Sequence, residues 1–351
     1  MRAPRHAVAI PVPRQFSVAG PLADDFVAWV QKQHDGTTRK LRAAAKRRSK
    51  GRAPKRARTH YWSDFRRIES ITPAAALVVA AQYDRSRQLS GDALSVYEYD
   101  HWKPQVRRVL EQVGFFDVLE IPGAVQPDAT GTARTMRIAR YETGSKLRQE
   151  RVGILVQQLL EYMLIADPEC LSSDERTLRT AQLFNALVEA TENTRRHAYP
   201  EDFLDEASVL PNWWLTGSAD PEERKLTLVV YDLGVSIPGS LASHRASQWA
   251  GHSPINRAIR RFTKGEFDEN DPESDHAKIR LAAKYGYSST DEEHRGKGLP
   301  VVREAIRHCR RGRLHVLSRF GEYIEESGAK PISRMLAHPM PGTLIVWDLW
   351  L

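Results

Sequence analysis

An apolar segment that stops at an aspartate, Leu226–Asp232, restricts the fold of this chain more than any other feature. The segment predicts a β-strand, and Gly234 follows it almost at once. A carboxylate at a strand end can accept a hydrogen bond from an exocyclic amine, and glycine lets the backbone approach a flat ring closely. The same residues are also typical of a strand followed by an ordinary turn. The segment therefore predicts a sheet, with Asp232 as a candidate binding residue at its edge.

A predicted helix over Asp174–Ala198 has two different faces. At 100° per residue, one arc is mostly apolar and contains Leu183, Phe184, Leu187, Val188 and Thr191. Glu189, Asn193 and His197 are spaced four residues apart and share the opposite arc. A polar stripe of this kind is typical of a solvated helix surface. It therefore becomes informative only in combination with the segments that follow it.

Two further segments place glycine beside a predicted element. A glycine pair opens onto the predicted helix Leu299–Cys309, in the run Arg295, Gly296, Lys297, Gly298, Leu299. Backbone N–H groups and the positive end of the helix dipole form an anion site suited to phosphate at such a position. Gly342 and Thr343 open a predicted last strand that ends at Trp350. Taken alone, the first segment is also typical of a loop-to-helix joint, and the second of a turn.

Taken in order, the four segments resemble the motifs of the GHKL (gyrase, chaperone, histidine kinase, MutL) ATP-binding domain. The resemblance covers Ser145–Leu351, and it lies in the ordered set rather than in any one member. The matching residues are Glu189 and Asn193, then Asp232 and Gly234, then Gly296, Gly298 and Leu299, and finally Gly342 and Thr343. One departure stands out, because Ser236 occupies the place where the family usually has a second glycine after the aspartate.

The resemblance implies ATP and Mg²⁺ as ligands, with a role for each matched residue. Asp232 and Gly234 are expected at adenine, and Thr343 is expected to support the adenine pocket. The phosphates are expected on the run Arg295, Gly296, Lys297, Gly298, Leu299. Asn193 is expected to hold Mg²⁺ together with the phosphates, since this hard cation is usually bound by few protein ligands. Glu189, one helical turn earlier, is the candidate catalytic base for an attacking water or an acceptor group.

The predicted fold class is α/β, more narrowly an α+β two-layer sandwich, with a small α/β domain ahead of a Bergerat-type ATP-binding domain that has a mixed sheet. The predicted division is an N-terminal strand and helix (1–35), a basic linker (36–63), a small α/β regulatory domain (64–135) and the ATP-binding domain (136–351). Within the small domain, Val106–Leu119 resembles the last helix of STAS-type regulatory domains.

The N-terminal elements are predicted from caps and periodicity. The predicted helices are Leu22–Gln33, Ala74–Arg87 with Thr72 as N-cap, and Pro104–Val113 ending at Gly114. The predicted strands are Arg66–Ile71 and Phe115–Ile121, after a β-like stretch at His6–Val18.

In the C-terminal half, a helix is predicted over Lys146–Ile165, and further strands over Arg313–Ser318 and Gly321–Glu325. Residues 242–293 correspond to the mobile ATP lid of the family. An acidic cluster in this stretch, Gly265–Asp275, is interpreted as a solvated, flexible loop rather than a second cation site.

The formal net charge of +8 comes from one segment, because Gly36–Ser63 contains eleven Lys or Arg and no acid. Two interpretations remain open for residues 37–58. The segment is either a solvated connector or an arm that binds nucleic acid by neutralising phosphates.

Other classes are excluded or left open by simple counts. The longest apolar run is far shorter than a membrane span, and Pro11 and Pro13 interrupt the only stretch that resembles a signal peptide. Two cysteines without metal-ligand spacing, Cys170 and Cys309, fit a reduced compartment, so a cytoplasmic protein without membrane association is predicted. The predicted activity is that of an ATPase or a protein kinase acting on a partner protein. The alternative is a nucleotide-gated binding module, either a partner-switching regulator or a nucleic-acid-associated protein, with little or no turnover. A sensor kinase using His101 is disfavoured because no dimerisation hairpin follows it. The sequence does not decide whether the protein forms a homodimer.

Overall fold

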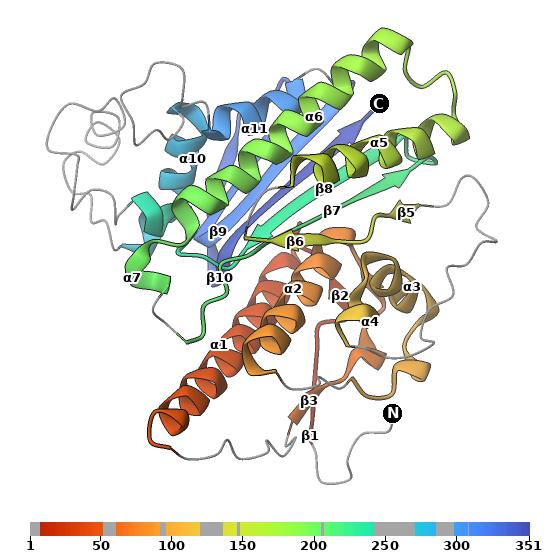
Figure 1. Cartoon of the computed structure of the whole chain (residues 1–351). Coiled ribbons are helices and arrows are strands. Elements are labelled where there is room, and N and C mark those ends of the chain that lie inside the picture. Colours follow the sequence, from red (N-terminus) through yellow and green to blue (C-terminus); the bar gives the residue numbers. More distant parts are fainter. Residues whose placement is uncertain are drawn as a thin grey trace, which may run out of the picture.

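A single antiparallel sheet organises the molecule (Figure 1). The computed structural model describes residues 8–51, 61–91, 96–119, 136–145, 148–204, 207–241, 271–285, 298–307 and 309–351. The six-stranded sheet has the order β5-β7-β8-β10-β9, and β6 pairs with β7. Its strands are β5 (Arg137–Ile138), β6 (Glu142–Gly144), β7 (Trp213–Asp220), β8 (Lys225–Asp232), β9 (Arg311–Glu326) and β10 (Ile332–Trp350).

One face of the sheet is covered by C-terminal helices, and these bury a mainly aliphatic core that includes the fully buried Trp347. The elements of this half are α5 (Gln149–Ala166), α6 (Ser173–Asn193), the π-helical turn η3 (Thr194–Ala198), α7 (Glu201–Leu204), η4 (Pro272–Ser274), α10 (Asp275–Tyr285) and α11 (Gly298–Arg307). Helix α6 begins with a capping box, in which Ser172 and Glu175 satisfy each other's backbone N–H groups.

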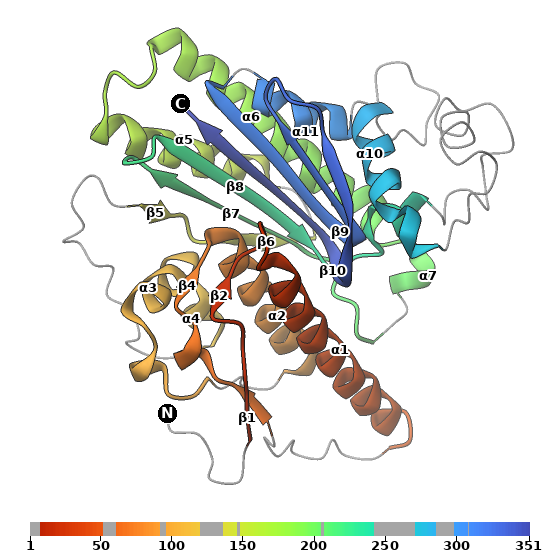
Figure 2. The ribbon, with the colours of Figure 1, turned by 180° about the vertical axis from the view of Figure 1, so that it is seen from behind.

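The opposite face is covered by the N-terminal half of the chain (Figure 2). Its helical elements are α1 (Ala23–Arg48), η1 (Phe65–Arg67), α2 (Pro73–Ser90), η2 (Tyr99–His101), α3 (Pro104–Val113) and α4 (Phe115–Val118). Two small parallel pairs complete it, β1 (Val8–Ile10) with β3 (Tyr61–Ser63) and β2 (Gln15–Phe16) with β4 (Ser70–Ile71).

The N-terminal half and the sheet share one hydrophobic core. Leu77 and Val78 of α2 belong to the same buried cluster as Trp214, Tyr231 and Val346 of the sheet. The predicted boundary near residue 135 lies outside the described residues, and the segments on its two sides pack together through this core. The N-terminal half is therefore a layer of the same folded body rather than a module with a core of its own.

The α+β sandwich predicted from the sequence is confirmed, and two of its details change. Every described pairing in the six-stranded sheet is antiparallel, so the mixed sheet of the prediction is not found there. Helices cover both faces, so the sheet is the middle layer of the molecule. Along the described part of the chain, no helix combines the length and the hydropathy needed to cross a membrane.

Caps predicted from the sequence are confirmed in the N-terminal layer. The Thr72 hydroxyl accepts from the Ala75 N–H at the start of α2, and Pro73 occupies the first turn. Gly114 ends α3 with φ of 95°, a conformation that favours glycine. The predicted helices over Ala74–Arg87 and Pro104–Val113 are present, each within a few residues of its expected ends.

Two predicted strands of this layer are wrong. Phe115–Val118 is a helical turn, in which Phe115 and Phe116 are buried with their ring centroids 5.6 Å apart and Val118 is also buried. The segment predicted as a strand over Arg66–Ile71 forms the 3₁₀ turn η1 and only a two-residue strand, β4. In η1 the Asp64 carboxylate caps the backbone N–H of Arg66 and also binds its guanidinium.

The basic linker predicted for residues 36–63 is also corrected at its start, because α1 continues through Gly36 to Arg48. Gly36 in a helix interior costs about 1 kcal/mol relative to alanine. Tertiary contacts offset that cost, since Leu41 is buried and the Thr38 hydroxyl accepts from the Arg85 guanidinium. Residues 52–60 of the predicted linker lie outside the described residues.

The C-terminal strands are longer than predicted. The two strands expected over 313–318 and 321–325 form one continuous strand, β9, in which Arg319 takes a left-handed φ of 52°. Strand β10 begins at Ile332 rather than at Thr343, and its pairing with β9 shifts register on both sides of Met340. Strand β7 was not predicted from the sequence.

Candidate functional site

A pocket opens between the end of α6 and the strand ends of β8 and β10, on the face covered by the C-terminal helices. It contains about 580 Å³ of empty space, part of it open to solvent. The lining residues are Ala190, Asn193, Thr194, His197, Ala198, Asp232, Ser236, Ile237, Ser240, Leu241, Ala282, Leu299, Thr343 and Ile345.

Asp232 is the buried acid of this pocket, and three donors hold its carboxylate. Its Oδ1 accepts from the Gly234 N–H at 2.9 Å, and its Oδ2 accepts from the Thr194 hydroxyl at 3.3 Å. The backbone N–H of Thr343, its neighbour across the strand pair, is the third donor. Burial raises the pKa of Asp232 to about 6, and the three hydrogen bonds limit that rise. At neutral pH the pocket therefore contains a buried, oriented negative charge.

The π-helical turn at the end of α6 brings two parts of this site together. It starts directly after Asn193, and its first residue, Thr194, reaches Asp232. At its last residue the Ala198 carbonyl accepts from the Val235 N–H at 2.8 Å. Such π-turns often occur at functional sites. The turn thus fixes the segment after β8 against α6.

Gly234 is required by this close packing. A Cβ at position 234 would lie 2.2 Å from the Ala198 carbonyl oxygen, a distance that real side chains do not adopt. The sequence prediction explained this glycine by close approach to a flat ring. The structure instead shows that the backbone of η3 occupies the space beside it.

The Gly342-Thr343 turn lies directly against Asp232. Gly342 has φ of 74°, and a Cβ there would lie 1.9 Å from the Asp232 carbonyl oxygen. The Thr343 hydroxyl is 2.9 Å from the Ser318 hydroxyl, and Ser318 also accepts from the Ile237 N–H at 2.9 Å. Sequence reasoning missed Ser318. The pairing of β9 with β10 places it opposite Thr343, and a register assignment for that hairpin would have found it.

Ser236, the departure from the family pattern, has a backbone conformation that favours glycine. Its φ is 77°, in the left-handed region where a side chain is strained. The serine hydroxyl partly offsets this by accepting from the Gly239 N–H at 3.1 Å, at the start of a short helix. The position therefore keeps the backbone shape of a glycine turn although its residue differs.

The predicted phosphate-binding segment is described only in part. Leu299, in the first turn of α11, lines the pocket, so the N-terminal end of this helix is at the pocket. Gly298 is the first residue of the helix. Arg295, Gly296 and Lys297 lie outside the described residues.

The structure separates the two predicted residues of the polar stripe on α6. Asn193 lines the pocket, together with His197. Glu189 is half-buried one turn earlier and is not part of the lining. Burial raises the pKa of Glu189, and the nearby Arg196 opposes that rise. In the described part of the chain, no group of three or more His, Cys, Asp or Glu is placed to hold a metal ion.

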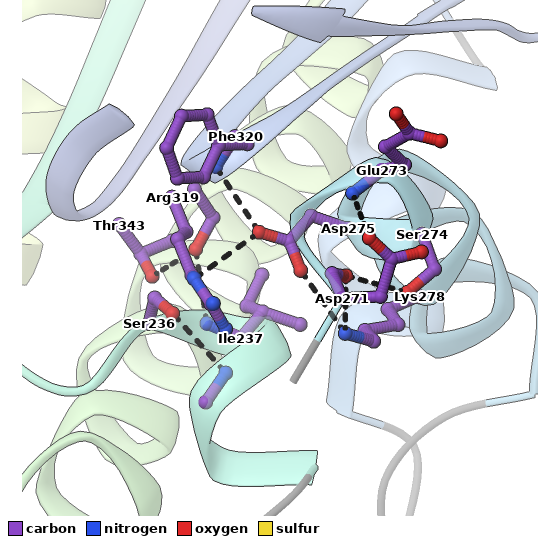
Figure 3. Close-up of polar contacts among 12 residues, drawn as sticks. Ser236, Ile237, Asp271, Glu273, Ser274, Asp275, Lys278, Arg319, Phe320 and Thr343 are labelled. Carbon is purple, nitrogen blue, oxygen red and sulfur yellow. Dashed lines mark hydrogen bonds and ion pairs between the residues drawn. The ribbon is translucent and has the colours of Figure 1, made fainter. Parts of the chain in front are cut away.

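Part of the predicted lid is a fixed element. Within the acidic cluster expected to be a solvated loop, Asp275 is fully buried at the start of α10 (Figure 3). Its carboxylate pairs with buried Lys278 at 3.1 Å and with Arg319 at 3.4 Å, and accepts from the Phe320 N–H at 3.2 Å. The interpretation as a flexible loop is therefore wrong for Asp275, and residues 242–270 and 286–297 lie outside the described residues.

The fold and the pocket together define an α+β sandwich protein with a buried carboxylate in a pocket beside the sheet. No protein-family model matches the chain, and no curated protein matches it.

Proposed function

We propose that this pocket binds ATP in the manner of GHKL proteins, with the adenine amine on Asp232. The observation that carries the proposal is the number of hydrogen bonds that the Asp232 carboxylate already accepts from the protein. An ionised carboxylate has about four acceptor positions, and the protein occupies three of them through Gly234, Thr194 and Thr343. One acceptor position is left in a buried setting, and an exocyclic amine has the matching donor.

The remaining lining suits a flat heterocycle. Ala190, Ala198, Ile237, Leu241 and Ile345 supply apolar surface beside the carboxylate. Burying an apolar ring face there gains about 25 cal/mol per Å² of area removed from water. A site of this kind combines apolar walls with one polar group that sets the orientation of the ligand.

The phosphate end of ATP is assigned to the N-terminal end of α11. Leu299 lies at the pocket in the first turn of that helix, where backbone N–H groups favour anions. Arg295 and Lys297 precede it in the sequence and would add positive charge, while Gly296 and Gly298 would let the backbone approach the phosphates.

Mg²⁺ fits the donor set that the described residues offer. Asn193 contributes one neutral amide oxygen at the pocket, and Mg²⁺ is commonly held by few protein ligands together with phosphate oxygens and water. When bound, the ion would supply neutralisation of phosphate charge. Asn193 would hold it, and Leu299 and Ile345 would restrict the access of water to the pocket.

Glu189 is assigned as the base that accepts a proton from an attacking water or an acceptor group. Its raised pKa makes it a stronger proton acceptor than a solvated glutamate. Because Glu189 lies outside the described lining, a nucleotide-gated binding module with little turnover is the second candidate. In both cases we place the protein in the cytoplasm, acting on a partner protein.

Nucleotide selectivity tests the adenine assignment. Inosine triphosphate has a carbonyl oxygen where ATP has its amine, and this oxygen would face the Asp232 carboxylate. We expect ITP to bind at least about a hundredfold more weakly than ATP, because a site built around a hydrogen bond rejects a ligand that cannot make it. Equal affinities measured by titration calorimetry would overturn the assignment of Asp232.

The fate of the γ-phosphate separates the activities. Radiolabel on protein indicates a kinase, release to solvent indicates an ATPase, and neither outcome indicates a binding module. Glu189→Gln is expected to retain ATP binding and to lose at least about a hundredfold in turnover. Glu192→Gln is the matched control on the same helix, because Glu192 pairs with Arg195 and Arg196. Unchanged turnover in Glu189→Gln would remove the catalytic role.

A further inference from the structure

The two halves of α1 differ in what they contact. In its first turns Phe26, Val27, Trp29 and Val30 are buried, and all four belong to the core that the N-terminal layer shares with the sheet. Beyond Thr38 the helix presents exposed cations, and among residues 39–48 only Leu41 is buried. Figures 1 and 2 show this second half reaching away from the sheet. The exposed basic residues of this stretch are Arg39, Lys40, Arg42, Lys46, Arg47 and Arg48, followed by Lys50.

The direction of the helix is set by contacts on its opposite side. Asp24, in the first turn, pairs with Arg334 of β10 at 3.4 Å. Further along, Arg85 of α2 lies 3.1 Å from the His34 ring nitrogen and donates to the Thr38 hydroxyl at 2.8 Å. The basic half therefore continues from a firmly attached helix rather than from a free end.

The cations gather on the side of α1 that faces away from the protein. At 100° per residue, Arg39, Arg42 and Lys46 fall within about 60° of one another, and Arg47 and Lys40 lie about 80–100° from Arg39 on one side of them. Leu41, which is buried, is on the opposite side of the helix. The result is a broad cationic surface, referred to below as the α1 basic face.

Most of these cations have no ion-pair partner among the described residues. No ion pair there involves Arg39, Lys40, Lys46, Arg47 or Arg48, and Gly36–Ser63 contains no acid. Elsewhere exposed arginines have partners, as Arg151 does with Glu142 and Arg140 with Asp117. Like charges held together on one helix repel one another, so a polyanion that binds the face relieves this repulsion.

We propose that the α1 basic face binds the phosphate backbone of double-stranded DNA without sequence preference. A helix with side chains, about 10–12 Å across, fits a major groove about 12 Å wide, and cations on a broad arc reach phosphates on both sides of it. The face contains Arg, Lys and Ala, so its contacts are mainly to phosphates rather than to base edges. A lipid surface fits less well, because a membrane-binding helix needs an exposed apolar side, and that side of α1 is buried.

Salt dependence measured by fluorescence anisotropy tests the proposal. The full chain, without nucleotide, is titrated with a labelled duplex of about 20 base pairs and mixed sequence between about 50 and 300 mM salt. With about six phosphate contacts, log K is expected to fall against log salt with a slope near −5. A slope near zero, or binding only to phosphatidylserine vesicles, overturns the proposal.

A charge-matched pair of variants locates the surface. Arg39, Arg42 and Lys46 all changed to Gln should reduce the magnitude of the slope by about 3 and weaken binding more than tenfold at low salt. Arg148, Arg310 and Lys330 are exposed and distant in sequence from α1, and changing them to Gln removes the same charge. This control should bind as the wild type does. Equal weakening in both triple variants contradicts a specific α1 basic face. Asp232→Asn should leave duplex binding unchanged, whether or not the pocket binds ATP.

Discussion

The two faces of the sheet are built from the same strands but have opposite characters. Tyr231 and Asp232 are neighbours on β8, and Tyr231 lies within the aromatic-rich N-terminal core while Asp232 lines the pocket. The N-terminal face is closely packed, with rings such as Phe65 and Phe115 within 6.5 Å of each other. The pocket face keeps empty space beside a buried charge. The contrast fits the proposal that one face binds a ligand while the other holds the strand ends in position.

One hydrogen-bonded path connects the two faces. Gln82 of α2 donates to the Tyr231 hydroxyl at 3.1 Å, and that hydroxyl donates to the Pro341 carbonyl at 2.9 Å. Pro341 directly precedes the Gly342-Thr343 turn that contacts Asp232. The N-terminal layer therefore contributes to the geometry of the pocket through contacts on the far side of the sheet.

The largest expected effect compares two glycines with nearly the same positive φ, one in close contact with neighbouring atoms and one with open space around it. Gly342→Ala should lower the free energy of unfolding by about 3 kcal/mol or more, because its Cβ would meet the Asp232 carbonyl oxygen. Gly328 has nearly the same φ, 75°, with nothing within 4 Å, so Gly328→Ala should cost only about 1 kcal/mol. Urea unfolding measures both. Equal losses would show that the close approach at Gly342 is not as tight as described.

A smaller effect is the pH dependence of stability, which compares one titrating group from each face of the sheet. Burial and Arg85 lower the pKa of His34 to about 3, and burial raises the pKa of Asp232 to about 6. As the pH falls below 6.5, the unfolded state takes up a proton at His34 that the folded state does not, so this group makes folding less favourable by up to about 1.4 kcal/mol per pH unit. Below pH 6, the folded state takes up a proton at Asp232 before the unfolded state does. Asp232 therefore makes folding more favourable as the pH falls, the opposite of His34.

Unfolding measured between pH 7 and pH 4.5 separates these contributions. Relative to the wild type, His34→Gln should become more stable as the pH falls, and Asp232→Asn should become less stable. Contributions from other titrating groups cancel in these differences. A His34→Gln curve parallel to that of the wild type would contradict the lowered pKa.

The hydrogen-bonded path through Tyr231 to Pro341 predicts an intermediate effect on ATP binding. Tyr231→Phe leaves the Pro341 carbonyl without its donor, which should cost about 1–3 kcal/mol of stability and weaken ATP binding severalfold. Tyr323→Phe also removes a buried hydroxyl, which donates to Glu325 away from the pocket. It should lower stability without changing ATP affinity. Tyr231→Phe with wild-type affinity would show that the N-terminal face does not position the turn.

The smallest expected effect concerns Ser236. Ser236→Gly removes the strain of φ 77° but also the hydroxyl that accepts from Gly239, so stability should change by less than about 1 kcal/mol. Ser236→Ala keeps the strain and loses the hydrogen bond, and it should be about 1 kcal/mol less stable than Ser236→Gly. The reverse order in thermal unfolding would contradict the strained conformation.

Local signals in the sequence predicted much of the fold. The strand ending at Asp232, the helix carrying Asn193, and the caps at Thr72 and Gly114 depend on periodicity and on residues next to one another. These signals persist in the structure because the tertiary packing agrees with them.

The remaining features depend on contacts between distant segments. Thr194 reaches Asp232 only because a π-turn ends α6, and Ser318 meets Thr343 only through the register of β9 and β10. Asp275 appears solvated from its acidic neighbours but is buried by Lys278 and Arg319. No local pattern contains this information, since each feature requires the position of a second element.

ATP binding by Asp232→Asn is the most direct test of the account. Titration calorimetry compares the wild type with Asp232→Asn and Asp348→Asn, each of which removes one carboxylate charge from the sheet. Asp348 lies on the same sheet, where it accepts from Thr227 at 2.7 Å outside the pocket. We expect Asp232→Asn to bind ATP about 30-fold more weakly or worse, because a charge-assisted hydrogen bond is lost and an amide donor faces the adenine amine, while Asp348→Asn binds as the wild type does. Wild-type affinity in Asp232→Asn would contradict the assignment of this pocket to adenine.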